Sequence, residues 1–258
     1  AALTLSQRGH FVSLFEKRNV LGGQLQFAAQ IPGKNEFFET VRYFQNQLKR
    51  NSVRIFLQAE VNKDFRIKYL EAPLSSGNYP NDNPQSLNEF DEVFDATGVI
   101  PRNPRIETEE SSSAKINILN YQEFLASPQP IKAPVVIVGG GPIAIDVAEK
   151  IIKEHEKIEF AVEWGVDFSG ITPGSLMPAH KAPSEVSITL CQRSKDRIGS
   201  GLGKTSGWIH RDFLKRKKVQ LLTGVTYKKI SPEGLIIEKT GKDGKVKEEL
   251  LKASSILF

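Results

Sequence analysis

The sequence predicts an α/β protein whose sheet is mostly parallel. Short apolar strands alternate with helical segments along the chain, which is the order that parallel βαβ units produce. One β-branched run, Val135–Val138, leads directly into three glycines and a helix, as a strand buried on both faces does. The 258 residues, 39% of them hydrophobic and 25% charged, suffice for one large core or two modest ones.

The first residues predict a helix, a strand and a terminal acid. Residues 1–8 resemble the end of a helix that stops at Gly9, and His10–Phe15 is a short apolar strand followed by Glu16. In a dinucleotide-binding βαβ unit this order follows the phosphate loop, and the acid, about 20 residues after the first glycine, accepts hydrogen bonds from a ribose. We therefore expect the glycine loop of this unit to precede residue 1. A solvated acid at a strand end is the commoner explanation of Glu16 alone.

Helical spacing over residues 35–50 predicts an amphipathic helix. Its apolar face is expected to hold Phe37, Phe38, Val41, Phe44 and Leu48. Other elements expected before residue 116 are strands at 53–57, 60–61 and 91–95, a surface loop at 73–88 and a polar crossing linker at 103–115. The strand at 91–95 runs into Ala96-Thr97-Gly98.

A second unit begins at Ala133. Its strand, Val135–Val138, and the glycine turn precede a helix that runs through about Ile152. After a long insertion at 153–185 come a strand at 186–191, a glycine-rich turn, a helix near 206–217 and several short strands. The last residues turn apolar, so we expect the chain to stop partway through a strand.

The pattern Gly139-x-Gly141-x-x-Ala144 is the sharpest signal for ligand binding. Between a strand and a helix, the first glycine permits a tight turn and the second lets a pyrophosphate approach the backbone, while the small third residue lets helix and strand pack closely. Amides at the helix start then face the phosphates. The turn Gly139-Gly140-Gly141-Pro142 is therefore predicted to bind a dinucleotide, with a purely structural turn as the alternative.

Basic residues follow the second strand of this unit. An NAD site has an acid at this place, whereas Gln192-Arg193-Ser194-Lys195 follows Cys191 here. The cationic groups of Arg193 and Lys195 suit a 2′-phosphate, so NADP is favoured over NAD. A solvated basic turn is the alternative.

The segment Leu21-Gly22-Gly23-Gln24 follows Glu16 closely. Its glycines would let the backbone approach a cofactor, and Gln24 could hydrogen-bond to that cofactor. The residues alone indicate no more than a turn.

Composition excludes several classes of function. The net charge of +5 suits anionic ligands but is too small to imply nucleic acid. A single cysteine, Cys191, cannot form an intramolecular disulfide, a four-cysteine zinc site or an all-cysteine iron–sulfur cluster. No apolar run approaches the ~20 residues of a membrane span, so we expect a cytoplasmic protein without a membrane partner.

Three further motifs are absent from the sequence. The run Gly199–Thr205 fails as an ATP-binding P-loop because position 198 is Ile198. The four histidines lack metal-ligand spacing, and no G-x-S-x-G elbow appears. No catalytic acid or base is therefore assigned, and the glycine run is expected to be a loop near the nucleotide or simply a turn.

Taken in order, Glu16, Gly22-Gly23-Gln24, Ala96-Thr97-Gly98 and the Gly139 turn resemble the flavoprotein reductases with two dinucleotide folds. The chain is most similar to the C-terminal half of the bacterial NADPH-dependent 2,4-dienoyl-CoA reductases, within the trimethylamine dehydrogenase-like iron–sulfur flavoproteins. The segments that carry this resemblance are AALTLSQRGH, LFEKRNVLGGQ, QIPGKNEFFETVRYF, ATGVIPR, EWGVD and GLGKTSGWIHR. The last is typical of this kind of reductase rather than of dinucleotide folds in general.

The resemblance implies two Rossmann-like units, an FAD domain interrupted by an NAD(P)H domain and incomplete at both termini. Residues 1–132 would be the partial FAD domain, without its first phosphate loop, and 133–258 the NAD(P)H domain. An FMN and 4Fe–4S barrel that acts on an acyl-CoA would precede them in the parent enzyme. FAD would contact Glu16, Gly22, Gly23, Gln24, Lys34 and the backbone at Val61, and would pass Ala96, Thr97 and Gly98. NADPH would contact Gly139, Gly140, Gly141, Pro142 and Ala144, with Arg193 and Lys195 at its 2′-phosphate.

Two alternatives stay open. A related module, such as one of the trimethylamine dehydrogenase-like fusions, would share both nucleotide folds and act on another substrate. A non-catalytic nucleotide-binding module would hold ADP-like ligands without turnover.

Overall fold

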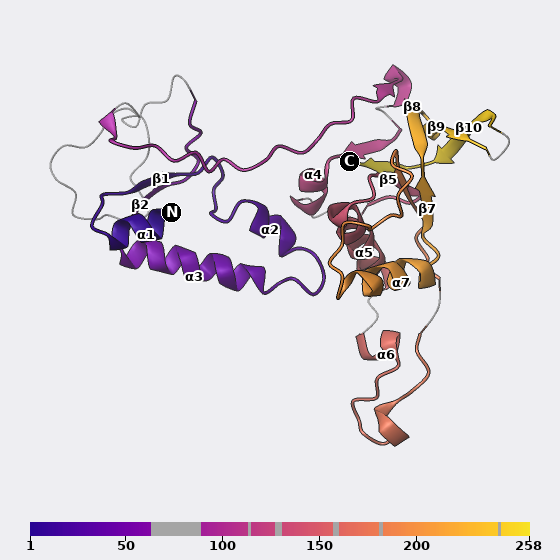
Figure 1. The fold of residues 1–258 in the computed structure, drawn as a ribbon, viewed down its shortest axis with the longest axis horizontal. Coiled ribbons are helices and arrows are strands. Elements are labelled where there is room, and N and C mark those ends of the chain that lie inside the picture. Colours follow the sequence, from indigo (N-terminus) through magenta and orange to yellow (C-terminus); the bar gives the residue numbers. More distant parts are fainter. Residues whose placement is uncertain (63–88, 113–114, 127–130, 157–159, 181–182, 242–243) are drawn as a thin grey trace. The chain divides into compact units, whose positions relative to one another are not determined.

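The computed structural model describes residues 1–62, 89–112, 115–126, 131–156, 160–180, 183–241 and 244–258. They form two compact units, Ala1–Val99 (unit 1) and Ile100–Phe258 (unit 2) (Figure 1). The loop predicted at 73–88 lies outside the described residues, as do parts of the segments 103–115 and 153–185.

Unit 1 is built around one short pair of parallel strands. Its elements are α1 (Ala2–Gln7), β1 (Ser13–Phe15), α2 (Gln24–Ala28), α3 (Phe37–Arg50) and β2 (Arg54–Phe56). Strands β1 and β2 pair in parallel, and a small core of Leu48, Val53 and Ile55 lies beside them. The order strand–helix–strand agrees with the predicted βαβ character of this region.

Helix α3 confirms the predicted amphipathic helix but not the whole of its predicted apolar face. Val41 and Leu48 are buried, whereas Phe38 is 40% and Phe44 47% exposed. Within the described part of unit 1, nothing covers the outer half of that face.

Two predicted strands of unit 1 are wrong. Residues 60–61 and 91–95 adopt no strand structure, and Val61, Val93 and Phe94 are largely exposed. A strand requires a hydrogen-bonded neighbour, and in the described residues none pairs with these segments. Helix α2 was missed, because its five residues are too few to show a helical period.

Unit 2 contains most of the regular structure. Its strands are β3 (Glu107–Thr108), β4 (Asn117–Leu119), β5 (Val135–Val138), β6 (Ile188–Gln192), β7 (Gln220–Thr223), β8 (Val225–Ser231), β9 (Gly234–Thr240), β10 (Val246–Lys252) and β11 (Ser255–Leu257). Its helices are η3 (Glu110–Ser112), α4 (Tyr121–Ala126), α5 (Pro142–Glu156), α6 (Phe160–Trp164), η4 (Pro173–Ser175) and α7 (Gly207–Arg216). The elements predicted at 135–138, 186–191 and 206–217 are confirmed within a few residues.

Five parallel strands form the central sheet in the order β4-β11-β5-β6-β7. From β5 the chain moves outward through β6 to β7, and it then returns to place β11 on the other side of β5. The strand order therefore reverses between β5 and β11. In open α/β sheets, the crevice outside the carboxyl ends of the strands at such a reversal is where ligands bind.

The chain between β7 and β11 forms an antiparallel meander, β8-β9-β10, with β3 added at the edge of β8. It packs against the parallel sheet through one shared core, which holds Ile116, Val136, Cys191, Leu222, Val225, Ile230, Leu235, Ile237, Leu251, Ala253 and Ile256. Helices α5 and α7 contact each other, since His210 Nδ1 lies 2.6 Å from Glu149 Oε1. The glycine turn thus begins in a strand that is buried and held by neighbours on both edges.

The polar segment predicted as a linker at 103–115 contributes strand β3 to unit 2, and β4 follows this segment. Strand β3 pairs with β8, and β4 pairs with β11. Because β3 and β4 pair with strands of unit 2, the compact unit 2 begins at Ile100 and not at Ala133. The boundary expected at 132/133 concerns nucleotide binding and stays a prediction.

Candidate nucleotide-binding site

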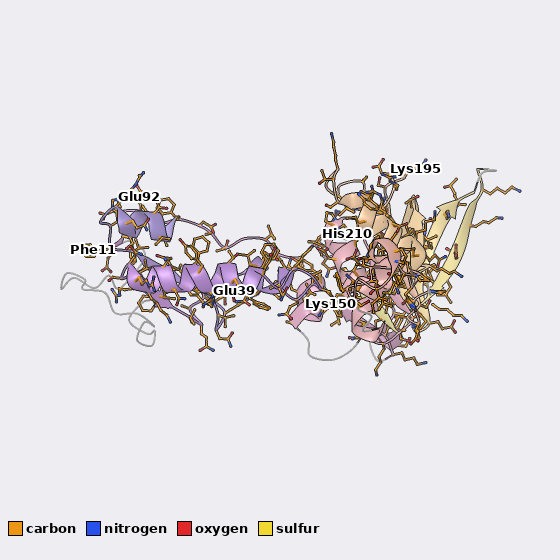
Figure 2. All side chains as sticks on the ribbon, turned by 90° about the horizontal axis from the view of Figure 1, so that it is seen from below. Phe11, Glu39, Glu92, Lys150, Lys195 and His210 are labelled. Carbon is orange, nitrogen blue, oxygen red and sulfur yellow. The ribbon has the colours of Figure 1, made fainter. Side chains whose placement is uncertain are left out.

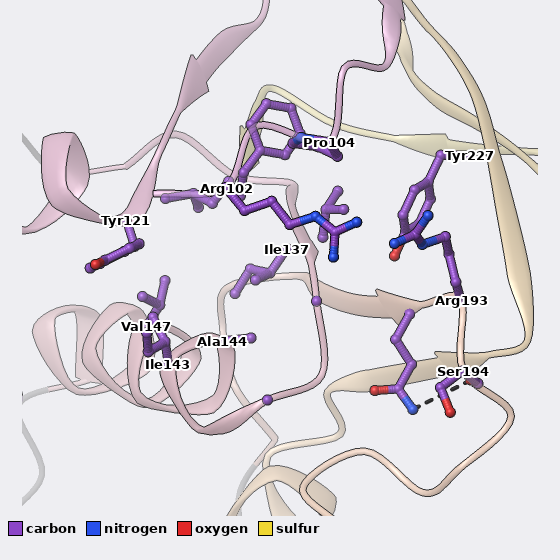
Figure 3. Close-up of a pocket in the computed structure, with 16 residues that line it drawn as sticks. Arg102, Pro104, Tyr121, Ile137, Ile143, Ala144, Val147, Arg193, Ser194 and Tyr227 are labelled. Carbon is purple, nitrogen blue, oxygen red and sulfur yellow. Dashed lines mark hydrogen bonds between the residues drawn. The ribbon is translucent and has the colours of Figure 1, made fainter. Parts of the chain in front are cut away.

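A cavity of about 460 Å³ opens at the carboxyl ends of β5, β6 and β11, beside the point where the strand order reverses (Figure 3). It is lined by Arg102, Pro104, Tyr121, Ile137, Val138, Gly139, Gly141, Ile143, Ala144, Val147, Gln192, Arg193, Ser194, Tyr227, Leu257 and Phe258. Its position is the one that the sheet topology assigns to a ligand.

Two glycines of the turn after β5 behave as the sequence predicts. Gly139 has a φ of +141°, which side chains rarely adopt, and its amide donates to the Cys191 carbonyl at 2.8 Å. A Cβ on Gly139 would lie 3.7 Å from the Ala144 Cβ, so a small residue at 144 keeps helix and turn close. A Cβ on Gly141 would meet nothing within 4 Å. Gly141 therefore presents bare backbone to the cavity.

Gly140 has a different role. A Cβ there would lie 1.8 Å from Gln192 Oε1 and 3.0 Å from Ile198 Cγ1. Its carbonyl accepts a hydrogen bond of 2.9 Å from the Gly199 amide, so the glycine-rich run that the sequence placed near the nucleotide packs on this turn. Gly140 is absent from the cavity lining and serves packing.

The start of α5 supplies donors for an anion. Pro142 opens this 15-residue helix, where its missing amide costs no hydrogen bond. Within the described part of the chain, no carbonyl accepts a hydrogen bond from the amides of Gly140 and Gly141. These amides and the helix dipole together favour a negative group in front of the turn.

Two arginines make the cavity cationic. Arg193 follows β6, and Arg102 comes from the segment before β3. The described lining contains no aspartate or glutamate, and in the described chain neither guanidinium has a salt-bridge partner. An anion that enters this space meets two uncompensated positive charges.

Tyr227 forms a fixed wall of the cavity beside Arg193 (Figure 3). Its hydroxyl donates to the Cys191 carbonyl at 2.9 Å. Burial raises the pKa of Tyr227, and the guanidinium groups of Arg193 and Arg102 only partly oppose that rise. Tyr227 is therefore a neutral group that ties β8 to β6.

Other predicted residues of this unit lie outside the cavity. Pro142 is exposed at the helix start, and Lys195 is exposed at the surface of the turn after β6 (Figure 2). A Cβ on Gly224 would lie 3.2 Å from the Lys195 Cγ, which places the lysine stem against the next loop. Of the two predicted cations, the structure thus brings Arg193 alone to the lining.

Sequence reasoning missed several lining residues. Arg102, Tyr121 and Tyr227 are distant from the glycine turn in sequence. Arg102 ends the segment ATGVIPR, so a signal for it was present, although no role could be given to it. Tyr121 and Tyr227 carried no signal, because only the sheet order places them here.

In unit 1, Glu16 directly follows β1, as predicted. Its carboxylate Oε1 accepts the Arg18 amide at 2.9 Å, and its carbonyl accepts the Ala59 amide at 2.9 Å. The segment that leads to Val61 therefore lies next to Glu16, at the carboxyl ends of both strands. Val61 itself is 42% exposed.

The other predicted residues of unit 1 lie on separate segments. Gly22 and Gly23, with φ of +116° and +49°, lead into α2 at Gln24, which is exposed. A Cβ on Gly22 would lie 2.8 Å from the Val41 Cγ2, so packing on α3 requires this glycine. Lys34 lies after α2 and is half-buried.

Ala96, Thr97 and Gly98 are exposed. The Asp95 carboxylate accepts the Thr97 amide at 3.0 Å and the Thr97 hydroxyl at 2.7 Å, and these bonds lower the pKa of Asp95. Gly98 follows with a φ of +78°. The structure thus shows an exposed segment held locally by the hydrogen bonds between Asp95 and Thr97.

The described residues were also compared with the requirements of a metal site and of a membrane span. In the described ranges, no three histidine, cysteine, aspartate or glutamate side chains cluster as ion ligands would. No described helix combines the length and the apolar character that crossing a bilayer requires.

Comparisons with known proteins relate the chain to oxidoreductases. The chain is 23% identical over 255 residues to a metal reductase of Desulforamulus reducens, which covers 97% of this chain and 34% of that protein. It is 26% identical over 250 residues to an NADH oxidase of Thermoanaerobacter brockii, covering 94% and 34%. The chain thus spans about a third of the length of these curated relatives.

Among solved structures, a 2-naphthoyl-CoA reductase complex superposes with a TM-score of 0.68 at 22% identity, covering 99% of this chain and 30% of that one. This likeness shows a shared fold. The sequence pattern of the pyridine nucleotide-disulphide oxidoreductases matches residues 1–258, and membership of that family implies binding of FAD and NAD(P)H. The reversed strand order, the glycine turn and the family pattern lead to one conclusion: this chain belongs to the pyridine nucleotide-disulphide oxidoreductases, as a module of a flavin-dependent oxidoreductase.

Proposed function

We propose that this chain is the electron-input part of a flavoprotein reductase and passes hydride from NADPH to FAD. The observation that carries the proposal is the cavity of unit 2, where the Gly139–Gly141 turn, the start of α5 and Arg193 meet at the reversal of strand order. Bare backbone at Gly141 and cations without acids fit a ligand with several phosphate groups.

The choice of NADPH over NADH rests on the residues after β6. In this position an acid would repel a 2′-phosphate and hydrogen-bond a 2′-hydroxyl. Gln192, Arg193 and Ser194 line the cavity instead. Arg193 can donate two parallel hydrogen bonds to a phosphate, which selects the phosphorylated nucleotide.

For FAD, the support comes from unit 1. Glu16 stands at the carboxyl end of β1, the place where an acid meets a ribose in a dinucleotide fold. The segment before Val61 is held beside it by the Ala59 amide. We extend the proposal to Gly22, Gly23, Gln24, Lys34 and Ala96–Gly98 as further FAD contacts, by their match to the resembled family.

When bound, the nicotinamide supplies a hydride and the flavin accepts it, so the protein contributes mainly position and electrostatics. The residues of unit 2 bind the phosphates at the turn and fix the adenosine end through Arg193. The apolar lining residues Ile137, Val147 and Leu257 exclude water from the remaining wall. No proton donor is required from this chain for that step.

In the parent enzyme, we propose that the electrons reach a barrel with FMN and a 4Fe–4S cluster that reduces 2,4-dienoyl-CoA thioesters. The support is the resemblance of the segments around Gly22, Gly98 and Trp208, together with a CoA thioester in the name of one structural neighbour. A related module with another substrate is the second candidate, which the similarity to a metal reductase and to an NADH oxidase favours.

The test adds NADPH or NADH, without oxygen, to the purified full-length protein that contains this chain and its bound FAD, and follows flavin absorbance. We expect NADPH to bleach the flavin. Binding of NADPH without bleaching would favour the non-catalytic alternative.

The same assay sharpens the assignment of Arg193. Arg193→Ala is expected to weaken NADPH binding by about tenfold or more, the worth of a charge-assisted hydrogen bond, and to leave NADH unchanged. Arg197→Ala is the matched control, because Arg197 is exposed on the same loop outside the cavity. Equal losses for both nucleotides would show that Arg193 does not bind the 2′-phosphate.

A further inference from the structure

We propose that Arg102 is the residue that clamps the pyrophosphate of the bound nucleotide against the glycine turn, whereas Arg193 binds the 2′-phosphate. The inference rests on the proposed function. It assigns one cation of the cavity to the pyrophosphate and the other to the 2′-phosphate. Arg102 would then serve any dinucleotide, and Arg193 only the phosphorylated one.

The position of Arg102 supports this division. In Figure 3 its side chain extends across the cavity with the guanidinium directed toward Tyr227 and Arg193, whereas Arg193 reaches the cavity from the end of β6. The carboxyl end of the first strand is where a dinucleotide places its pyrophosphate, and the end of the second strand is where it places the adenosine ribose. Arg193, at the end of β6, is thereby matched to the adenosine ribose, which leaves Arg102 as the cation of the lining for the pyrophosphate.

The charges of the glycine turn and of a pyrophosphate also favour this role for Arg102. The turn offers peptide amides and a helix dipole, which together amount to about half a positive charge at a helix start. A pyrophosphate carries two negative charges, so the turn alone compensates it incompletely. Arg102 is exposed, and among the described residues it has no carboxylate within salt-bridge distance, so its full charge is available.

Geometry makes arginine suitable for this role. A guanidinium donates two parallel hydrogen bonds to adjacent phosphate oxygens, and a lysine ammonium cannot do so. Arg102 follows Pro101 and precedes Pro104 by two residues, and prolines fix the backbone φ on both sides of it. The side chain is thereby presented from a restrained segment.

Two fragments of the nucleotide separate the two sites. ADP-ribose contains the pyrophosphate without a 2′-phosphate, and 2′,5′-ADP contains the 2′-phosphate without a pyrophosphate. Calorimetric titration of the whole protein with both fragments compares wild type, Arg102→Gln and Arg193→Gln. Arg105→Gln is the matched control, since Arg105 is exposed nearby and does not line the cavity.

Arg102→Gln is expected to weaken ADP-ribose by about tenfold or more and to weaken 2′,5′-ADP less. Arg193→Gln should show the reverse order, and Arg102→Lys should recover part of the loss. An unchanged melting temperature in Arg102→Gln separates lost binding from lost folding.

Two outcomes would overturn the division: a loss confined to 2′,5′-ADP in Arg102→Gln, or no loss with either fragment. Failure of the wild type itself to bind ADP-ribose, 2′,5′-ADP and NADPH would instead overturn the proposed function. The wild-type titration thus distinguishes the two failures.

Discussion

The sequences of units 1 and 2 show the same kind of strand–helix–strand pattern. Only in unit 2 does this pattern form a large parallel sheet. In the described residues, unit 2 contains a parallel sheet of five strands, whereas the sheet of unit 1 has two strands of three residues each. Among the large, fully buried side chains of the described residues, Ile55 alone belongs to unit 1. The glycine turn of unit 2 therefore rests on a rigid frame.

The difference shows what a nucleotide site requires besides its motif. Unit 1 leaves Phe11 61% exposed (Figure 2) and Tyr43 55% exposed, and its predicted cofactor residues lie on separate segments. In unit 2 the lining comes from residues as distant in sequence as Arg102 and Phe258. Sheet order, rather than the local pattern, assembles that cavity.

The largest expected effect tests whether the core of unit 2 supports the site. Leu190 on β6 is fully buried, and Leu190→Ala is expected to cost about 2–5 kcal/mol through lost burial and a cavity. Trp164 and Trp208 are the two tryptophans of the sequence, and both lie in unit 2, so urea unfolding followed by tryptophan fluorescence reports that unit. Leu221→Ala, at a residue 40% exposed on β7, is the control with a small expected effect.

Hydrogen exchange extends the same experiment to unit 1. In Leu190→Ala the amides of β1 and β2 should keep their wild-type exchange rates. Faster exchange in both units would show that they unfold together and would contradict the contrast drawn between them.

A smaller effect is expected from the bare backbone of the turn. Gly141→Ala adds a Cβ into open space, so the melting temperature should hold, while affinity for NADPH should fall by about tenfold or more. Gly140→Ala instead displaces the Gln192 side chain and is expected to lower stability, at about 1 kcal/mol for a disturbed hydrogen bond.

Calorimetric melting and nucleotide titration of both variants check this pair. Full NADPH affinity in Gly141→Ala would contradict a pyrophosphate at the turn. A melting temperature unchanged in Gly140→Ala would show that Gln192 moves at no cost.

The smallest effect is a pH dependence that belongs to unit 2. Burial raises the pKa of Glu149 above its ordinary value of 4.5, and the hydrogen bond from His210 opposes that rise. Because the folded pKa is the higher one, the contribution of Glu149 to stability is complete below the unfolded pKa and is lost as pH rises through the folded pKa. Lys153 and Asp146 also act on this carboxyl, in opposite directions.

Glu149→Gln removes this titration and keeps an acceptor for His210. The stability of the variant relative to wild type should therefore increase as pH rises from mildly acidic to neutral, measured by urea unfolding with tryptophan fluorescence. A difference that stays constant with pH would contradict the raised pKa.

Sequence alone predicted the α/β class, the strand Val135–Val138 and the tight glycine turn that follows it. These predictions succeeded because each depends on a local pattern, β-branched burial or glycine spacing. Arg193 lines the cavity, and its contact with a 2′-phosphate stays a prediction. The strand predicted at 91–95 was wrong because it depended on a neighbour that the described chain does not provide. Tyr227 could not be predicted as a lining residue, because it reaches the cavity through the meander β8-β9-β10. No short stretch of sequence reveals how these strands pair.

Strand β11 has a consequence for the synthesis of the protein. It lies between β4 and β5, and its Ser255 pairs with Val135, 120 residues earlier. On the ribosome, β4 and β5 emerge long before the strand that joins them, and each has one edge of unsatisfied amides and carbonyls. The nascent chain therefore passes through a stage at which a foreign strand can add to those edges, and chaperone binding at that stage would protect the growing sheet.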